Sequence, residues 1–430
     1  MGSSAIPSPH SLRPVRPRRT RQRLLCVGAT VLLIAGLCVN FNSVAQARGK
    51  RQAGQVSTTK RQTDAIKAGV KWLAKNQSPG GKWGDEKNTR VADTSFALLA
   101  LMANGNLVTA GRPLEFGTAG ERGASVPELR GPYAAQVKKG VEYLARLAWD
   151  DRGGTKPRGY ISDDKESRMH GHGFATLALA TAAGNLGGNK TRDIKAWLAG
   201  GSGRDPSGLP LADQVRWALK LAIDCIEASQ DRDTGGWLYE PYEQGHEGSM
   251  TVTQIAALRA ARDAGMEVSD AVLARAYEYV RTSQNLTRGD KHGGFAYTKT
   301  NKGRVSYALT SAALTTLYGL GRYGLKKNDA KLIENGFRYM DRHTKKAVSA
   351  QQWFYYGLFY GAQALYVSQD HRRLARDWPK IRNAILAKHN HTDGSFNPLQ
   401  HDLRSRPYCT AIAVLTLQVP LETLPIFQRR

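Results

Sequence analysis

The sequence contains few cysteines and few acidic residues for its size. Two of its four cysteines, Cys225 and Cys409, lie beyond residue 40, so this part of the chain can form at most one disulfide. Packing, and not a disulfide framework, must therefore stabilise the fold. The 62 lysines and arginines outnumber the 36 acidic residues and give a formal net charge of +26. Such an excess attracts acidic polymers or anionic lipid, or it serves solubility alone.

The chain is also short of long apolar runs near its amino terminus. The apolar stretch from Leu24 to Val39 is shorter than the roughly 20 residues that a membrane-spanning helix needs. Six arginines precede it, and the small residues Ala45 and Ala47 follow it, an order typical of an export signal. We therefore expect a signal peptide at residues 1–47, a linker at 48–64 and export to the periplasm or the medium. An uncleaved signal would instead anchor the protein to a membrane.

Beyond residue 64 one pattern recurs along the chain. Its clearest copy begins with Gly-Val-Lys-Trp-Leu at 69–73, passes Gln77 and a glycine turn at 80–83, and ends in the apolar stretch 93–101. Apolar residues at helical spacing on both sides of a turn predict two helices joined by a loop. Five weaker copies follow, and their turns carry Gly153-Gly154 with Tyr160, Trp237, Phe295, Trp353 and Phe396. The fifth copy, at Trp353, has no glycine pair.

The two helices of each copy differ in character. The first is amphipathic and the second mostly apolar, which predicts an outer and an inner layer. Six such hairpins can bury their apolar faces by closing into a ring, which removes the ends that an open solenoid would have to cap. We therefore predict an all-α fold, an α/α toroid of about six helix hairpins over residues 65–430. The segments 107–133 and 186–212, rich in glycine, proline and charge, should be excursions outside the ring.

The first copy resembles the glutamine-tryptophan motif of squalene and hopene cyclases, with Ala68 in place of the basic residue expected before the motif. The matching residues are Gly69, Trp72, Leu73, Gln77, Gly81 and Trp83. The resemblance implies the toroid shared by terpenoid cyclases and protein prenyltransferase β subunits. We expect Gln77 to tie an outer helix to the backbone of the next repeat, and the turn aromatics to serve as scaffold.

The resemblance also implies a central cavity lined by residues at the starts of the inner helices. The positions that match are Asp93, His172, Glu247, Ser249, Arg304, Ser306, Gln352 and Tyr408. Polar groups at all six starts suit a polar mouth to the cavity, so we predict that these residues bind the ligand. Helix caps are the alternative interpretation, above all for Asp93 and the serines.

Catalytic acids are less clear than the scaffold. Cyclases of this type use an Asp-x-Asp-Asp motif, and the nearest approach is Ile161-Ser162-Asp163-Asp164. Asp163 and Asp164, together with Glu247, are our candidates for catalytic acids, because acid catalysis needs a carboxyl group aimed at the substrate. Adjacent acids on a loop are otherwise solvated surface groups.

Metal-binding motifs are equally incomplete. Asp224 adjoins Cys225, so the Asp-x-Cys zinc motif of prenyltransferases is absent. A zinc site at Cys409 with preceding histidines, or one at His170 and His172, is conceivable but matches no compact motif. The sequence contains no thioester motif, phosphate-binding glycine loop or Gly-x-Ser-x-Gly elbow. We expect no metal and no cofactor.

Three functions remain open. The first is an exported, terpenoid-cyclase-like protein that binds an apolar or amphipathic small molecule in the cavity, with or without turnover. The second is a noncatalytic envelope module for an acidic polymer or a protein partner. The third is an exported lyase or hydrolase of uronic-acid polymers that uses His172, Glu247 and Arg304. An aromatic pocket favours the first, a filled centre the second and an open basic cleft the third. Nucleic acid is not an expected partner.

Overall fold

The computed structural model describes residues 58–84, 89–109, 127–150, 154–187, 206–320, 329–399, 405–421 and 423–424. The chain divides into the units Met1–Gln52 and Ala53–Arg430, and every described residue belongs to the second. The predicted signal peptide and most of the predicted linker lie outside the described residues, as do Gly153 and His401.

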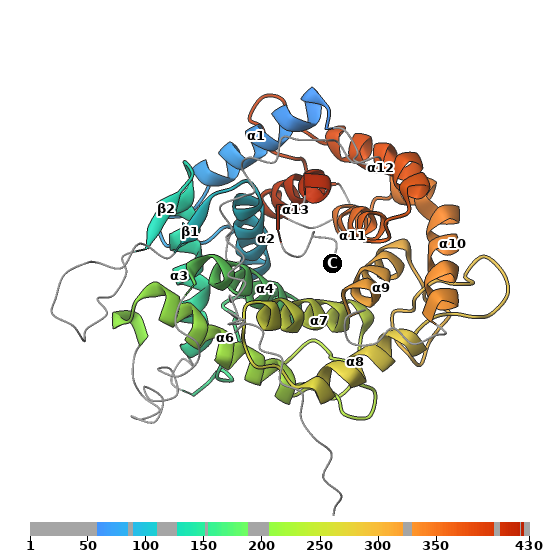
Figure 1. Cartoon of the computed structure of the whole chain (residues 1–430), viewed down its shortest axis with the longest axis horizontal. Coiled ribbons are helices and arrows are strands. Elements are labelled where there is room, and N and C mark those ends of the chain that lie inside the picture. Colours follow the sequence, from blue (N-terminus) through green and yellow to red (C-terminus); the bar gives the residue numbers. More distant parts are fainter. Residues whose placement is uncertain are drawn as a thin grey trace, which may run out of the picture. The chain divides into compact units, whose positions relative to one another are not determined.

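Within the described residues, twelve α-helices form six consecutive hairpins. The first helices form the outer layer of Figure 1: α1 (Lys60–Lys75), α3 (Ala134–Trp149), α6 (Leu211–Ala228), α8 (Asp270–Thr282), α10 (Asp329–Ala347) and α12 (His371–Leu386). The second helices form the inner layer: α2 (Arg90–Ala103), α4 (Arg168–Leu186), α7 (Gly248–Asp263), α9 (Tyr307–Leu320), α11 (Phe354–Val367) and α13 (Arg406–Gln418).

The inner helices form a closed ring. Each packs against the inner helices before and after it, and α13 packs against α2 to complete the circle (Figure 1). Every residue of α2 is buried, whereas α12 buries one face only. Short elements accompany the helices: the 3₁₀ turns η2 (Pro206–Gly208) and η4 (Val419–Leu421), and the antiparallel strands β1 (Leu107–Thr109) and β2 (Glu128–Arg130). The predicted all-α toroid is thus confirmed, and the ends of the first predicted excursion pair as β1 and β2.

A glycine joins each of five turns to the outer helix of the next hairpin. These glycines have a left-handed φ of 82° to 87°, and a Cβ atom on any of them would press against backbone of that helix. The contacts are Gly81 with Lys139, Gly159 with Leu221, Gly235 with Arg275, Gly293 with Asn335, and Gly394 with Ala68. The following residue on the helix is always small: Gly140, Ala222, Ala276, Gly336 or Gly69. The turn can approach the helix backbone this closely because its glycine carries no side chain at the contact.

The glutamines of the repeat hold the same joints. Gln77 Nε2 donates to the carbonyl of Gly81 and to that of Gln136 just ahead in the next outer helix, both at 2.8 Å. Gln230 and Gln284 make the equivalent pairs of hydrogen bonds. The expected tie between repeats is therefore present in three of them. The turn aromatics Trp83, Trp237, Phe295 and Phe396 are no more than 1% exposed, as scaffold residues should be.

The second turn differs from the one read in the sequence. Gly159 and Ile161 occupy the places that Gly81 and Trp83 hold in the first turn, because Gly159 has the left-handed φ and packs on the next outer helix. Gly154, which we had assigned to the turn, has no atom within 4 Å of its Cβ position. The prediction from the glycine pair alone therefore placed this turn several residues too early in the chain.

Hydrogen bonds between the first and last hairpins close the ring. Gln62 Nε2 donates to the Leu417 carbonyl at 2.7 Å, and the Ser405 hydroxyl donates to Asp93 at 2.5 Å. Both bonds are buried or partly buried, so they are formed in place of bonds to water and join the two ends of the ring.

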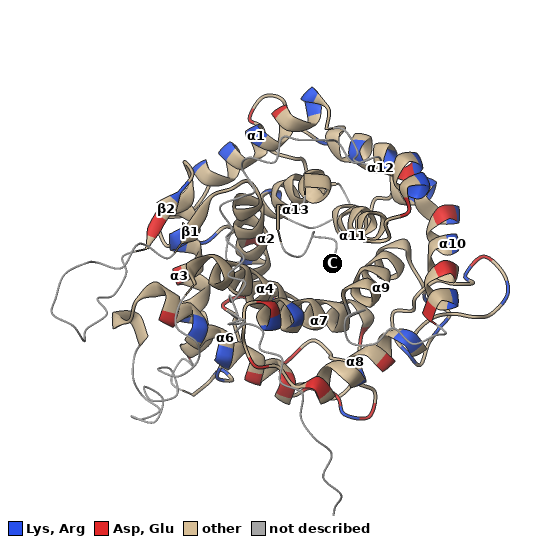
Figure 2. Ribbon diagram, in the orientation of Figure 1, with Lys and Arg blue, Asp and Glu red and all other residues tan. Residues whose placement is uncertain are grey.

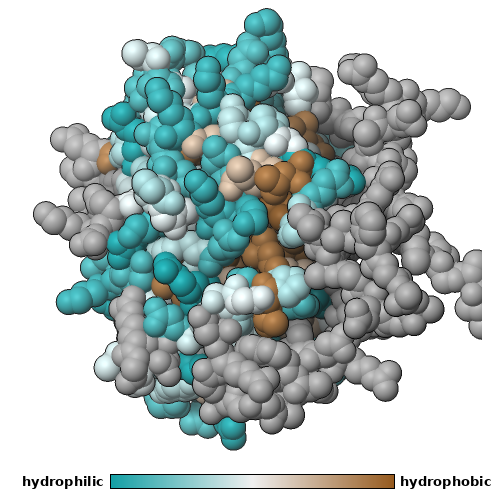
Figure 3. Space-filling view, turned by 90° about the vertical axis from the view of Figure 1, so that its left-hand side faces the viewer, coloured by the Kyte–Doolittle hydropathy of each residue, from teal (hydrophilic) through white to brown (hydrophobic). Residues whose placement is uncertain are grey.

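The charged side chains lie mainly on the outer helices, and the inner layer carries few (Figure 2). The face beside β1, β2 and α3 is largely hydrophilic, with one hydrophobic stripe (Figure 3). No described helix is long and apolar enough to cross a membrane. The outer layer thus presents the charge and the inner layer provides the core.

The glycine joints predict a clear difference between two substitutions. Gly235→Ala should lower the free energy of unfolding by more than about 2 kcal/mol, because it adds a backbone clash to a strained φ. Gly265→Ala has the same left-handed strain but open space around the new methyl group, so it should cost only about 1 kcal/mol. Chemical denaturation of both variants measures the difference, and equal losses would show that the joint tolerates a side chain.

Candidate ligand pocket at the mouth of the ring

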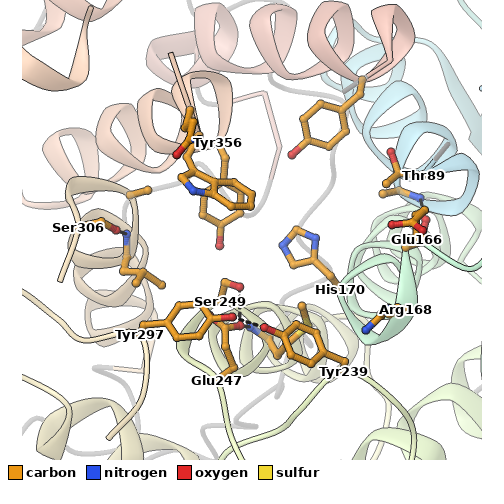
Figure 4. A pocket seen from close by; sticks show the side chains of 18 of the residues that line it. Thr89, Glu166, Arg168, His170, Tyr239, Glu247, Ser249, Tyr297, Ser306 and Tyr356 are labelled. Carbon is orange, nitrogen blue, oxygen red and sulfur yellow. Dashed lines mark hydrogen bonds between the residues drawn. The ribbon is translucent and has the colours of Figure 1, made fainter. Parts of the chain in front are cut away.

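A pocket of about 510 Å³ opens where the inner helices begin. Its wall includes Glu247, Ser249, Arg304, Ser306, Gln352 and Tyr408, all of which the sequence placed at inner-helix starts. Much of the remaining wall is aromatic. Tyr239, Tyr297 and Tyr356 surround the opening, and His170 points into it (Figure 4). The pocket therefore combines ring faces with a small number of polar groups.

Glu247 caps the amino terminus of α7. Its Oε2 accepts hydrogen bonds from the Met250 amide at 2.9 Å and from the Ser249 hydroxyl at 2.6 Å. The side chain is 1% exposed, and Oε1 is buried without a hydrogen-bond partner among the described residues. Burial raises the pKa of Glu247 above its ordinary value, although these hydrogen bonds and the charge of Arg304 oppose the shift. A carboxyl group in this setting holds a proton more readily than a solvated one.

Ser249 connects this carboxyl group to the pocket. Because the Ser249 hydroxyl donates its proton to Glu247, its oxygen is left as an acceptor for a group in the pocket. Glu247 can therefore act on a ligand through Ser249 as well as by its own position in the wall.

Two tyrosines and two arginines form one side of the opening. The hydroxyl groups of Tyr239 and Tyr297 are hydrogen-bonded to each other (Figure 4). The Arg304 guanidinium lies 4.0 Å from the centroid of the Tyr297 ring, and that of Arg168 lies 5.5 Å from the Tyr239 ring. Such contacts with a ring face hold a planar guanidinium group in place and leave the N–H edge of Arg304 able to bind an anion or a hydroxyl group. Arg168 Nε already donates to the Lys165 carbonyl at 3.4 Å and lies 3.7 Å from a Glu240 carboxylate oxygen.

Tyr356 and Trp353 also line the pocket. Burial raises the pKa of Tyr356 well above its ordinary value, so its hydroxyl stays protonated. Trp353 lies at the start of α11 with a left-handed φ of 56° and is 56% exposed. A bulky residue in this conformation costs on the order of 1–3 kcal/mol.

Asp93 and His172 do not line the pocket, although we predicted that they bind ligand. Asp93 is fully buried and accepts hydrogen bonds from Thr89 and Ser405 at the ring seam. His172 is also fully buried, and its Nδ1 accepts the Ile161 amide at 3.1 Å. Burial lowers the pKa of His172 to about 3, which keeps the ring neutral. In four other hairpins a threonine hydroxyl accepts the equivalent amide: Thr94, Thr251, Thr310 and Thr410.

Asp163 and Asp164 also lie away from the pocket wall, contrary to the hypothesis that they act as catalytic acids. Asp163 accepts from Arg90 Nε at 2.9 Å and from the Tyr143 hydroxyl at 2.6 Å. Asp164 accepts from the backbone amides of Val91 and Ser167 at 2.9 and 2.6 Å. These carboxylates join the loop before α4 to the start of α2, so their hydrogen-bonding capacity is used for structure.

The tyrosines and His170 are the residues that sequence reasoning missed. Tyr239 and Tyr297 each follow a turn aromatic by two residues, at Trp237 and Phe295, so the repeat register could have located them. His170 was noted as a possible metal ligand with His172, but only His170 reaches the pocket.

Metal ligands do not gather in the part of the chain that the structure describes, where no group of three or more histidine, cysteine, aspartate or glutamate side chains could hold an ion. Cys225 and Cys409 are buried and form no disulfide with each other. Burial raises the pKa of Cys225 to about 12, so it is not a thiolate at neutral pH.

Comparisons with known proteins support the fold alone. No protein-family model and no curated protein sequence matches the chain. The chain is similar in structure to the GH76A α-1,6-mannanase from Salegentibacter sp. HEL1_6, with a TM-score of 0.51 and 9% identity over 84% of this chain and 100% of that one. It also matches D-mannose isomerase (TM-score 0.49, 12% identity, 84% and 99% covered) and the type II terpene cyclase MstE from Scytonema (0.46, 14%, 85% and 100%). The chain thus has the α/α toroid architecture, and its resemblance to squalene cyclases in particular stays a prediction.

Glu247 predicts a pH-dependent stability. Because its pKa is raised in the folded state, that state binds more protons than the unfolded chain above the ordinary value of 4.5. The free energy of unfolding therefore falls as pH rises through this window. Glu247→Gln keeps a hydrogen-bond acceptor but cannot ionise, so its stability relative to wild type should increase as pH rises above 4.5. Denaturation at a series of pH values tests this, and parallel profiles would contradict it.

Proposed function

We propose that the protein binds an amphipathic small molecule in the mouth pocket. The observation that carries the proposal is the pairing of a buried carboxyl group, Glu247 with Ser249, with a wall of tyrosine rings. A volume of about 510 Å³ suits a small organic molecule, since ligand pockets are typically about 300–1,000 Å³ and mostly apolar with a few placed polar groups. The ligand's apolar face would lie on the tyrosines and its polar groups on Ser249 and Arg304.

The amino-terminal sequence supports a location for this binding. The arginines and the apolar stretch before residue 47 support export of the mature protein, so the ligand would be met outside the cytoplasm. The basic surface would favour encounters with anionic lipid or polymer, though screening by salt limits its range to about 10 Å.

A pocket-filling substitution tests the binding proposal. Leu309 is partly exposed in the wall, so Leu309→Trp should fill the pocket and weaken binding at least about tenfold, while Leu309→Met keeps the volume and should bind as wild type. Native mass spectrometry of protein purified from its own host should show a copurified amphipathic molecule in wild type and Leu309→Met but not in Leu309→Trp. A pocket that is empty in all three proteins would refute the proposal.

One observation favours a second candidate, hydrolysis of a uronic-acid polymer. Glu247, Arg304 and His170 lie in the same pocket, where a protonated carboxyl group could protonate the leaving oxygen of a glycosidic bond and an arginine could bind a uronate. Water would add to the anomeric carbon as the leaving oxygen takes the proton. Incubation with polyuronate should then release new reducing ends, and Glu247→Gln should abolish the release. An unchanged polymer after prolonged incubation with wild type rejects this candidate.

A further inference from the structure

We propose that the mouth pocket continues past Trp353 into a second subsite, and that the ligand is an amphipathic anion whose apolar body occupies the mouth pocket and whose anionic head group occupies the subsite. This inference rests on the proposed function and adds the chemical class of the ligand. The head group would be a phosphate or a carboxylate, which share the same chemistry toward lysine.

The two spaces are adjacent. A second cavity of about 330 Å³ adjoins the mouth pocket, and five residues line both. These shared residues are Val305, Ser306, Ala308, Gln352 and Trp353. A ligand that occupies both spaces would lie along this common wall.

The second cavity exists because the fifth hairpin lacks a turn. Residues 348–353 alone separate α10 from α11, whereas residues 283–306, with their glycine joint, separate α8 from α9. The short connection brings no turn aromatic back over the hairpin. Because the connection is short, Trp353 lies directly before α11. The opening of the ring therefore extends further toward the outer layer at this hairpin.

Trp353 forms the boundary between the two spaces. It differs from Trp83, Trp237, Phe295 and Phe396, which are at most 1% exposed, because it is 56% exposed. An exposed indole held in a left-handed conformation offers a flat apolar face to a chain that passes from one space to the other. Backbone strain of this kind is found mainly at functional sites, so the left-handed φ of Trp353 beside a cavity supports a role in ligand binding.

The charges of the second cavity favour an anion. Lys291, on the loop before Phe295, and Lys346, on the last turn of α10, both line it and are exposed. Neither forms an ion pair with another described residue, and they outnumber the one acid in the lining, Asp290, whose carboxylate lies 3.3 Å from His343 Nε2. Two ammonium groups are thus available for a head group, while the mouth pocket provides the ring faces for its apolar body.

Two amphiphiles with the same alkyl chain test the inference. Isothermal titration calorimetry would measure binding of decyl phosphate and decyl glucoside, both below their micelle concentrations, to the purified chain. The double variant Lys291→Ala/Lys346→Ala should weaken binding of decyl phosphate by about tenfold or more, the value of one lost charge-assisted hydrogen bond. Its binding of decyl glucoside should stay within about twofold of wild type, because a neutral head group forms no ion pair with an ammonium group. Trp353→Ala should weaken both.

Lys345→Ala is the matched control, since Lys345 is exposed next to Lys346 but does not line the cavity. A double variant that binds decyl phosphate as tightly as Lys345→Ala overturns the inference. So does a wild type that binds decyl glucoside but not decyl phosphate, and in that case the proposed function stands. A wild type that binds neither amphiphile refutes the proposed function itself.

Discussion

The contact on which the ring depends is that between a turn glycine and the backbone of the next outer helix. It recurs in five of the six hairpins, each time with a left-handed glycine on one side and a small residue on the other. A glutamine secures three of these joints by bonding both backbones. Because the spacing is set by backbone against backbone, sequence can vary widely elsewhere while the angle between successive hairpins stays the same. Low sequence identity to other toroids is compatible with such a scaffold.

The position and shape of the pocket depend on which hairpins contain the glycine joint and on the one hairpin that lacks it. The regular turns bring Tyr239 and Tyr297 to the mouth beside Glu247, at the same offset from their turn aromatics. The fifth hairpin has no joint, so its inner helix begins at once and Trp353 is left exposed. A ring of near-equivalent repeats thereby acquires a distinct side, and the binding surface is asymmetric although the scaffold is nearly symmetric.

The sequence predicted the fold well because the repeat shows itself as apolar residues at helical spacing, and this spacing is determined by the local geometry of a helix. It also located Glu247, Arg304, Ser306, Gln352 and Tyr408 at the mouth, since helix starts can be read from the same register. It failed for His172, because only the fold shows that this imidazole replaces the threonine that accepts a turn amide in four other hairpins. The place of Asp163 and Asp164 outside the pocket wall was unpredictable for a similar reason: their partners, Arg90 and Val91, are about 70 residues earlier in the chain and become neighbours only when hairpins pack.

The seam of the ring has a consequence for how the protein is made. Gln62 bonds to Leu417 and Asp93 to Ser405, so the first hairpin finds its last partners more than 300 residues later in the chain. During synthesis an apolar edge of the early hairpins stays uncovered until the final helix has been made. A chain released before that point has no segment that could cover this edge. Quality control during biosynthesis could therefore monitor a single event, the docking of α13 between α11 and α2.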